Sequence, residues 1–243
     1  MKENSKSYYP VLEDVSDYAE MEKQCQVLEK RTVLWILPWN AVSLNEADTY
    51  DEAYLAHVKT IFSIAEGYSL QILLTPELTL FSLPSWVMQE LNRVKLNEES
   101  IRFECPYQSR NETDQSCLFT FFLALFFLGN DLFPEIKHEG ESIQDFLQEQ
   151  CIFAMKHAAR RLKKNTNIEG FYFSKMLSED FLYSYIKNIQ NIELKNNERS
   201  EKLVISPELI KTKVDDFKLC FKNEIIKKHD HFIFKSDTNE TEA

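Results

Sequence analysis

Hydrophobic residues along the chain alternate between helical spacing and short uninterrupted runs. Residues 12–30 and 50–66 carry apolar side chains every three or four positions, which predicts two amphipathic helices. Each stretch is followed by an apolar run, 32–37 and 70–74, that predicts a strand. Because the first run is uninterrupted, we expect that strand to be buried on both faces. The order helix, strand, helix, strand indicates parallel α/β architecture.

The second half of the chain continues this pattern less regularly. Residues 83–115 are mostly polar and predict a long surface excursion, whereas 118–128 are apolar and fit either a helix or a strand. Ser142 begins a capping box for a helix to about residue 164, and 168–173 predict a third strand. Ser206 and the proline after it begin a further helix. Its apolar stripe consists of Ile210, Val214, Phe217, Phe221 and Ile225.

Composition excludes several classes of function. Acidic residues outnumber basic ones by 39 to 28, and the net charge of −11 argues against nucleic acid or an anionic membrane as partner. The four glycines are far apart, so no loop can cradle a phosphate or a dinucleotide, and we expect no cofactor. The longest apolar run falls short of the ~20 residues that a transmembrane helix needs.

Cysteine and histidine residues give no sign of a metal site. The five cysteines form no C-x-x-C pair, which is typical of free thiols in a reducing compartment, so we expect a cytoplasmic protein. His229 and His231 lie close together, but no third ligand follows at a fixed spacing. We therefore expect a solvated loop there and no bound metal.

Six short strings, in this order and at this spacing, resemble glycoside hydrolase family 5. The likeness is to its subfamily of endoglycoceramidases, fungal glucosylceramidases and steryl-β-glucosidases. The strings are WNAV at 39–42, YDEAYL at 50–55, PSW at 84–86, LFFLGND at 125–131, IQDFLQ at 143–148 and NIEGF at 167–171.

This resemblance implies a (β/α)₈ barrel, with chemistry at the carboxyl ends of the strands. Residues 33–37, 70–75 and 168–173 would then be the second, third and fourth barrel strands. The first strand and most of the second half would be missing. The expected fold is thus a helix-rich α/β protein, a partial or degenerate TIM-barrel-like fold with roughly the first half of the barrel and a divergent C-terminal helix.

The same reading divides the chain into four parts. We expect a disordered N-terminus at 1–10, a half-barrel glycosidase-like domain at 11–192, a divergent C-terminal cap helix region at 193–235 and a disordered tail at 236–243. The sequence leaves open whether residues 198–235 complete the barrel fragment or form an unrelated cap.

The resemblance also implies that the chemistry of the family is absent. The family's acid/base glutamate lies in an Asn-Glu-Pro string after the fourth strand, where this chain has Lys175-Met176-Leu177. The family's nucleophile, on the seventh strand, has no counterpart. Retaining glycosidases need two carboxyl groups about 5 Å apart. We therefore expect no enzymatic activity, the alternative being a relocated pair made by Glu77 with Glu179 or Asp180.

Two tryptophans and a phenylalanine-rich segment are candidate binding residues. Trp39 and Trp86 match family tryptophans and are candidates for stacking on a sugar, although core packing is the favoured interpretation. For the phenylalanines of 118–128, a buried helix is favoured over a lipid-facing patch.

The sequence thus predicts a catalytically inactive glycosidase-like protein. It would act as a structural or interaction module, with self-association or a partner protein covering its open barrel edges, or as a residual binder of a glycolipid or glycan. The alternative is a hydrolase of lipid β-glucosides such as glucosylceramide or steryl glucoside. A decaying gene product is also left open.

Overall fold

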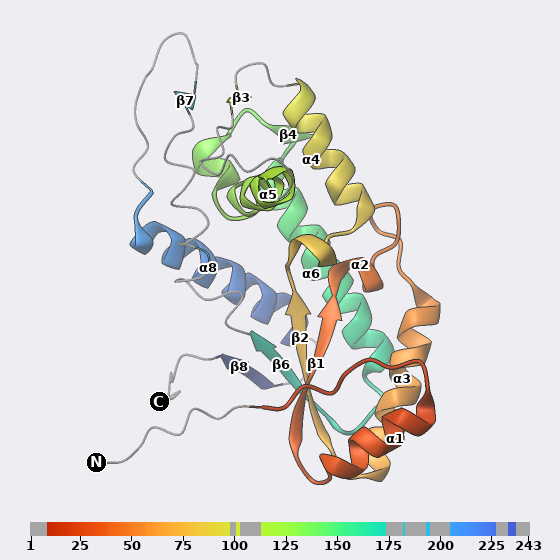
Figure 1. Ribbon diagram of the computed structural model, residues 1–243. Coiled ribbons are helices and arrows are strands. Elements are labelled where there is room, and N and C mark those ends of the chain that lie inside the picture. Colours follow the sequence, from red (N-terminus) through yellow and green to blue (C-terminus); the bar gives the residue numbers. More distant parts are fainter. Residues whose placement is uncertain are drawn as a thin grey trace, which may run out of the picture.

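Four parallel strands form the centre of the molecule (Figure 1). The computed structural model describes residues 9–97, 101–102, 113–173, 182, 193–194, 205–226 and 233–236. Within these residues the main sheet has the order β1-β2-β6-β8, and every neighbouring pair is parallel. Its strands are β1 (Thr32–Pro38), β2 (Gln71–Glu77), β6 (Ile168–Phe173) and β8 (Ile233–Ser236). Strands that follow one another in the chain are therefore neighbours in space, as in a (β/α)₈ barrel, and the predicted α/β class is confirmed.

Capped amphipathic helices accompany this sheet. They are α1 (Tyr18–Val27), α3 (Glu52–Gly67), α6 (Ile143–Leu162) and α8 (Pro207–Phe221), continued by the π-helical turn η4 (Lys222–Ile226). At each N-terminus the side-chain oxygen of the capping residue accepts a hydrogen bond from a backbone N–H of the first turn; the capping residues are Asp17, Asp51, Ser142 and Ser206. The starts predicted at Ser142 and Ser206 are confirmed. The first helix begins later than expected, because the extended segment before it pairs with β1.

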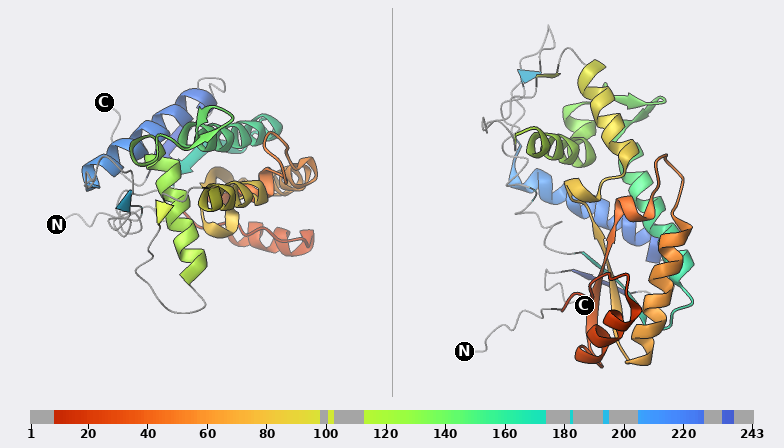
Figure 2. Two further views of the ribbon diagram at one scale, coloured as in Figure 1. Left: turned by 90° about the horizontal axis from the view of Figure 1, so that it is seen from above. Right: turned by 45° about the vertical axis from the view of Figure 1, so that its right-hand side comes forward.

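A second group of elements lies beyond the carboxyl ends of β1 and β2 (Figures 1 and 2). It contains α2 (Trp39–Val42), the 3₁₀ turn η1 (Leu80–Ser82), α4 (Ser85–Asn97) and α5 (Thr113–Leu132). Two pairings of two-residue strands complete it: β3 (Ile101–Arg102) with β7 (Glu193–Leu194), and β4 (Lys137–His138) with β5 (Glu141–Ser142).

Two expectations for this group are decided by the structure. Residues 118–128 are helical and all but the partly buried Leu118 are buried, so the buried-helix interpretation is confirmed. The polar excursion predicted at 83–115 instead contains α4, whose buried residues Val87, Leu91 and Val94 recur at helical spacing. Among the described residues, no helix combines the length and apolarity needed to cross a membrane.

Strand β1 is buried on one face and partly open on the other. Val33, Trp35 and Leu37 are buried, but Ile36 is 38% exposed, so the prediction of two buried faces was wrong. The Trp35 ring packs edge-on against Phe62 of α3 at 5.4 Å. Ile36 points to the opposite, inner side of the sheet. A closed barrel fills that side with side chains from opposing strands, and the strands described here make up only part of the circle.

The chain before α1 contributes a short strand-like segment to the sheet. Val11 bridges Leu34 of β1 in parallel, with hydrogen bonds from Leu34 N to Pro10 O at 2.8 Å and from Leu12 N to Leu34 O at 2.9 Å. This isolated bridge lies where a strand before β1 would pair, and within the described residues no strand precedes β1. The predicted N-terminal disorder falls mainly on residues 1–8, which lie outside the described residues.

The C-terminal region joins the same sheet and core. Strand β8 pairs in parallel with β6, with Phe171 opposite Phe234. The predicted stripe of α8 is buried from Ile210 to Ile225. The described residues of this region, 205–226 and 233–236, thus share the sheet and the core of the barrel fragment. The boundaries of the four predicted parts stay predictions.

Candidate functional site at the strand ends

In parallel barrels, ligands bind at the carboxyl ends of the strands, so a functional site is expected there. The described strands end at Pro38, Glu77, Phe173 and Ser236. Among these four residues, Glu77 alone carries a carboxyl group. A second polar group would have to come from the connections that follow the strands.

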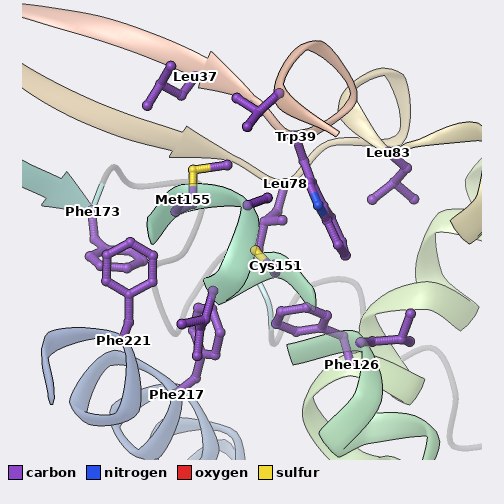
Figure 3. Packing of buried hydrophobic residues seen from close by; sticks show 14 of the residues in the cluster. Leu37, Trp39, Leu78, Leu83, Phe126, Cys151, Met155, Phe173, Phe217 and Phe221 are labelled. Carbon is purple, nitrogen blue, oxygen red and sulfur yellow. The ribbon is translucent and has the colours of Figure 1, made fainter. Parts of the chain in front are cut away.

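Aromatic side chains fill the space beyond β1 (Figure 3). Trp39, the first residue after the strand, is 0% exposed, and its indole meets that of Trp86 edge-on at 5.7 Å. Phe122 and Phe126 of α5 approach the same indole at 6.5 Å. Side chains from α2, α4 and α5 therefore close the region in which a barrel enzyme would hold its substrate.

Both candidate sugar-stacking residues belong to this aromatic cluster. Trp86 is 8% exposed, and its Nε1 donates a hydrogen bond to Ser43 Oγ at 3.1 Å. The ring of Trp86 also meets Phe146 at 5.7 Å. Each indole thus packs against protein in this structure, which agrees with the core interpretation, and their binding of a sugar stays a prediction.

The end of β6 is closed in the same way by α8. Phe173 meets Phe221 edge-on at 4.9 Å, and Phe217 lies at 5.1 Å from Phe126 of α5 (Figure 3). The two aromatic clusters therefore join along α5 and α8 into one apolar layer across the described strand ends.

Glu77 lies at the edge of this layer. Burial raises the pKa of its carboxyl group above the usual range, which favours the neutral acid. The Glu77 carbonyl accepts a hydrogen bond from Ser82 Oγ at 2.9 Å, which fixes the backbone at the strand end. Two residues earlier on the same side of the strand, the buried Thr75 Oγ1 has no hydrogen-bond partner among the described residues. A carboxylic acid in such surroundings can donate a proton.

The proposed partner of Glu77 cannot be placed. Glu179 and Asp180, like Lys175-Met176-Leu177, lie outside the described residues. The relocated carboxylate pair therefore stays a prediction, as does the loss of the family's acid/base group.

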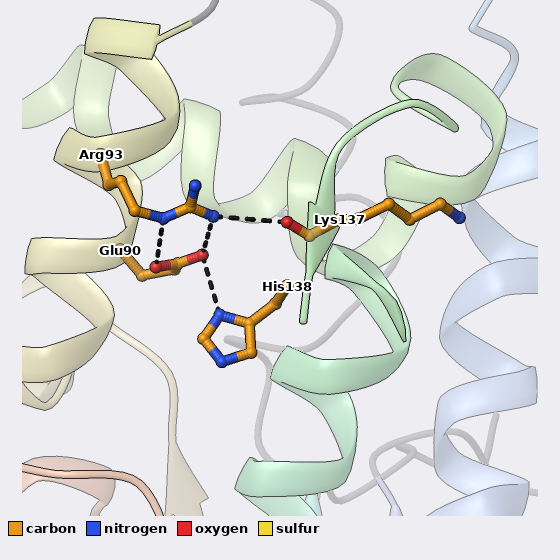
Figure 4. Close-up of polar contacts among 4 residues, drawn as sticks. All are labelled: Glu90, Arg93, Lys137 and His138. Atoms are coloured by element: carbon orange, nitrogen blue, oxygen red, sulfur yellow. Dashed lines mark hydrogen bonds and ion pairs between the residues drawn. The ribbon is translucent and has the colours of Figure 1, made fainter. Parts of the chain in front are cut away.

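Sequence reasoning missed a polar cluster that links α4 to the β4–β5 hairpin (Figure 4). Glu90, whose side chain is 10% exposed, accepts hydrogen bonds from Arg93 Nε at 2.8 Å, from Arg93 Nη2, and from His138 Nδ1 at 3.1 Å. The hydrogen bonds from Arg93, and then from His138, lower the pKa of Glu90. The His138 ring stacks on Phe146 at 3.8 Å. Only the Glu90–Arg93 spacing of three was visible in the sequence.

The remaining reactive groups show ordinary structural surroundings. Burial raises the pKa of Cys25 to about 11 and also raises that of Cys151, which keeps both thiols protonated. Glu52 pairs with His157 and Arg161 on the surface. No cluster of three metal-ligating side chains occurs in the described part of the chain, and His229 and His231 lie outside it.

Comparison with known proteins finds likeness in structure alone. No family model and no curated protein matches the sequence. Endo-glycoceramidase II from Rhodococcus sp., in a complex with a cellobiose-like imidazole, matches with a TM-score of 0.55 and 11% identity, over 90% of this chain and 43% of that one. Cryptococcus neoformans sterylglucosidase 1, crystallised with hit 9, matches with a TM-score of 0.51 and 15% identity, over 65% of this chain and 26% of that one.

This chain therefore spans less than half the length of either solved chain. At such low identity the likeness establishes the fold and leaves activity open. The resemblance predicted from the sequence is confirmed at that level: the chain has the fold of a divergent, partial family 5 glycosidase barrel.

Proposed function

We propose that this chain is a catalytically inactive, glycosidase-like barrel fragment that acts as an interaction module. The observation that carries the proposal is the burial of Trp39 against Trp86, Phe122 and Phe126 at the end of β1. A sugar ring has no room there unless several fully packed side chains move, and packed interiors resist such changes. A binding role on the outside of the fragment needs no such change.

The carboxyl groups support the same proposal. Hydrolysis with retention needs an acid/base and a nucleophile held about 5 Å apart. Glu77 is the one carboxyl group among the residues that end the four described strands. Losing one member of a cooperating catalytic set already lowers the rate by several orders of magnitude.

A glycosidase is the second candidate, because burial raises the pKa of Glu77 as suits a general acid. Glu179 would then be its partner. The neighbours in structure are named for steryl glucosides and glycoceramides, so a lipid β-glucoside is the substrate class, and residual glycolipid binding is the non-catalytic counterpart. The free cysteines favour the cytoplasm as location.

Hydrolysis of a fluorogenic β-glucoside and of glucosylceramide by the purified chain separates the two candidates. We expect no turnover above the buffer rate. If the chain is instead a glycosidase that uses Glu77, we expect turnover that Glu77→Gln lowers by at least about 100-fold. The matched control is Glu20→Gln, which removes an exposed carboxylate from α1, away from the strand ends. Turnover lost in Glu77→Gln and kept in Glu20→Gln would refute the proposal.

A further inference from the structure

The outer face of α6 separates acidic from basic side chains along the helix. Positions three or four apart share one face of a helix, so its outward-facing residues form a single row. This row, here called the charged stripe, consists of Asp145, Glu149, Phe153, Arg160 and Lys164. In Figure 2, α6 lies between α3 and α8, and neither neighbour buries the four charged residues of the stripe.

The acidic part of the stripe carries more negative charge than the described residues neutralise. Some loss of surrounding water, and then the negative charge of nearby carboxylates, raises the pKa of Glu149. These carboxylates, in decreasing order of effect, belong to Glu141, Asp48, Glu224 and Asp145. Neither Glu149 nor Asp145 forms an ion pair with another described residue. Positive charge brought here from outside would therefore relieve the repulsion.

The basic part of the stripe is unusual in so acidic a chain. Residues 160–164 contain four basic side chains in five positions, although the net charge of the chain is −11. Arg161 pairs with Glu52 of α3. Arg160, Lys163 and Lys164 are exposed and make no ion pair in the part of the chain that the structure describes. The helix dipole favours bases at this end, but its ~0.5 negative charge cannot neutralise three cations.

The two parts of the stripe match in spacing as well as in sign. Asp145 and Glu149 are four residues apart, and so are Arg160 and Lys164. Two copies of α6 can lie antiparallel about a two-fold axis that passes just after Phe153. Asp145 of each copy then faces Lys164 of the other, and Glu149 faces Arg160. Because the axis repeats every contact, each of these pairs forms twice.

The centre of the stripe is aromatic. The Phe153 ring is half-buried, and the Lys156 ammonium lies 5.5 Å from its centre. Lys156 is held there by its ion pair with Glu224 at 2.7 Å. In the antiparallel arrangement the Phe153 rings of the two copies come together beside the axis. Interfaces between proteins have this layout, with apolar contact at the centre and charged groups at the rim.

We propose that the outer face of α6 is a binding site for a second copy of this chain, which docks antiparallel on the same face to form a symmetric dimer. The charge pattern identifies the occupant, since the acidic part of one copy fits the basic part of the other. A helix face of this size and charge suits a weak dimer that dissociates in salt. This inference rests on the interaction-module proposal and names its site and partner.

The molar mass of the purified chain tests the dimer, and analytical ultracentrifugation measures it. We expect a mass approaching that of two chains at about 300 µM protein in about 50 mM NaCl, and a Kd at least about tenfold higher in about 500 mM NaCl, because salt screens exposed charges. A monomer at both salt concentrations would overturn the inference. A dimer with the same Kd at both would do so as well, because its contacts would lie elsewhere.

Charge reversal tests the pairing of the two parts. Arg160→Glu with Lys164→Glu makes both parts acidic, whereas Asp145→Lys with Glu149→Lys makes both parts basic. Each double variant alone should raise the Kd at least about 100-fold, because like charges then face each other. An equimolar mixture of the two should form a heterodimer at least as tight as the parent dimer, since every acidic part then meets a basic one.

The matched control reverses two exposed bases away from the stripe. Lys23→Glu with Arg31→Glu changes the net charge as much as Arg160→Glu with Lys164→Glu does. Both control positions lie in or just after α1, which Figure 2 shows across α3 from α6. Its Kd should stay within about threefold of the parent value, because distant charges are screened.

Two outcomes of these variants would contradict the dimer. One is a mixture of the two reversed variants that stays monomeric although each is folded by far-UV circular dichroism. The other is a control that dissociates as fully as Arg160→Glu with Lys164→Glu. Because none of these measurements uses hydrolysis, a failure here leaves the proposed inactivity to be judged by the glucoside assay.

Discussion

Glu90 shows how a single carboxylate can join two parts of this molecule. It is nearly buried on α4, and it receives hydrogen bonds from Arg93 of the same helix and from His138 of the hairpin. A buried charge is stable only when such partners surround it. The cluster therefore fixes α4 over the strand ends, beside the aromatic contacts of Trp86.

Neutralising Glu90 should destabilise the protein in a pH-dependent way. Because its pKa is lowered in the folded state, the stabilisation is present above the unfolded pKa of about 4.3 and is lost as pH falls through the folded value. We expect Glu90→Gln to lower the free energy of unfolding by about 1–3 kcal/mol at pH 7, with a smaller difference from the parent near pH 3. Urea unfolding at both pH values measures it. The control, Glu135→Gln, alters an exposed residue and should change little; a Glu90→Gln effect independent of pH would contradict the assignment.

Single residues also show how much of the candidate site could be predicted from the sequence. Trp39, Trp86 and Glu77 could be picked out because each falls within or beside a string that resembles a known family. Nothing in the sequence pairs Glu90 with His138, since 48 positions separate them and their contact depends on how α4 lies against the hairpin. The packing of Trp39 against α5 was hidden for the same reason.

Among the elements, α6 and α8 were predicted well because their signals are local. A capping serine and an apolar stripe lie within one segment, and both helices begin where those signals place them. Helix α4 was missed because its polar residues outnumber its buried ones. Both faces of strand β1 were predicted to be buried. Burial of the inner face depends on side chains from other strands of the barrel, so it cannot be inferred from the sequence of β1 alone.

Helix α8 should be held mainly by one side chain of its buried face. Phe217 contacts Phe126 and Phe127 of α5 and Phe173 of β6. We expect Phe217→Ala to lower the free energy of unfolding by about 3–5 kcal/mol. Leu219→Ala on the same helix, at a position that is 58% exposed, should change it by less than about 0.5 kcal/mol. Similar losses for both, measured by urea unfolding, would show that α8 does not pack as described.

At the scale of the whole molecule, one apolar core runs from the sheet to α8. Buried residues of β1, α3, α5, α6, β6 and α8 belong to a single cluster. The N-terminal elements and helix α8 of the C-terminal region are therefore packed together. The fold accordingly needs both regions.

Unfolding should consequently be a single transition. Indole fluorescence reports the surroundings of β1, because Trp35 and Trp39 lie in or next to it, whereas far-UV circular dichroism reports all helices, α8 included. We expect the two urea curves to coincide in midpoint and slope, because regions that share one hydrophobic core unfold together. Two separated transitions would indicate that residues 193–235 form an independent unit.

The near-perpendicular contact of Trp39 and Trp86 has an optical consequence. The two indoles lie 5.7 Å apart at 85°, so their electronic transitions couple and should give a pair of circular dichroism bands of opposite sign. The strength of that couplet depends steeply on the distance and the angle between the rings. The intensity of these circular dichroism bands would therefore report a displacement of α4 from the end of β1 without any added label.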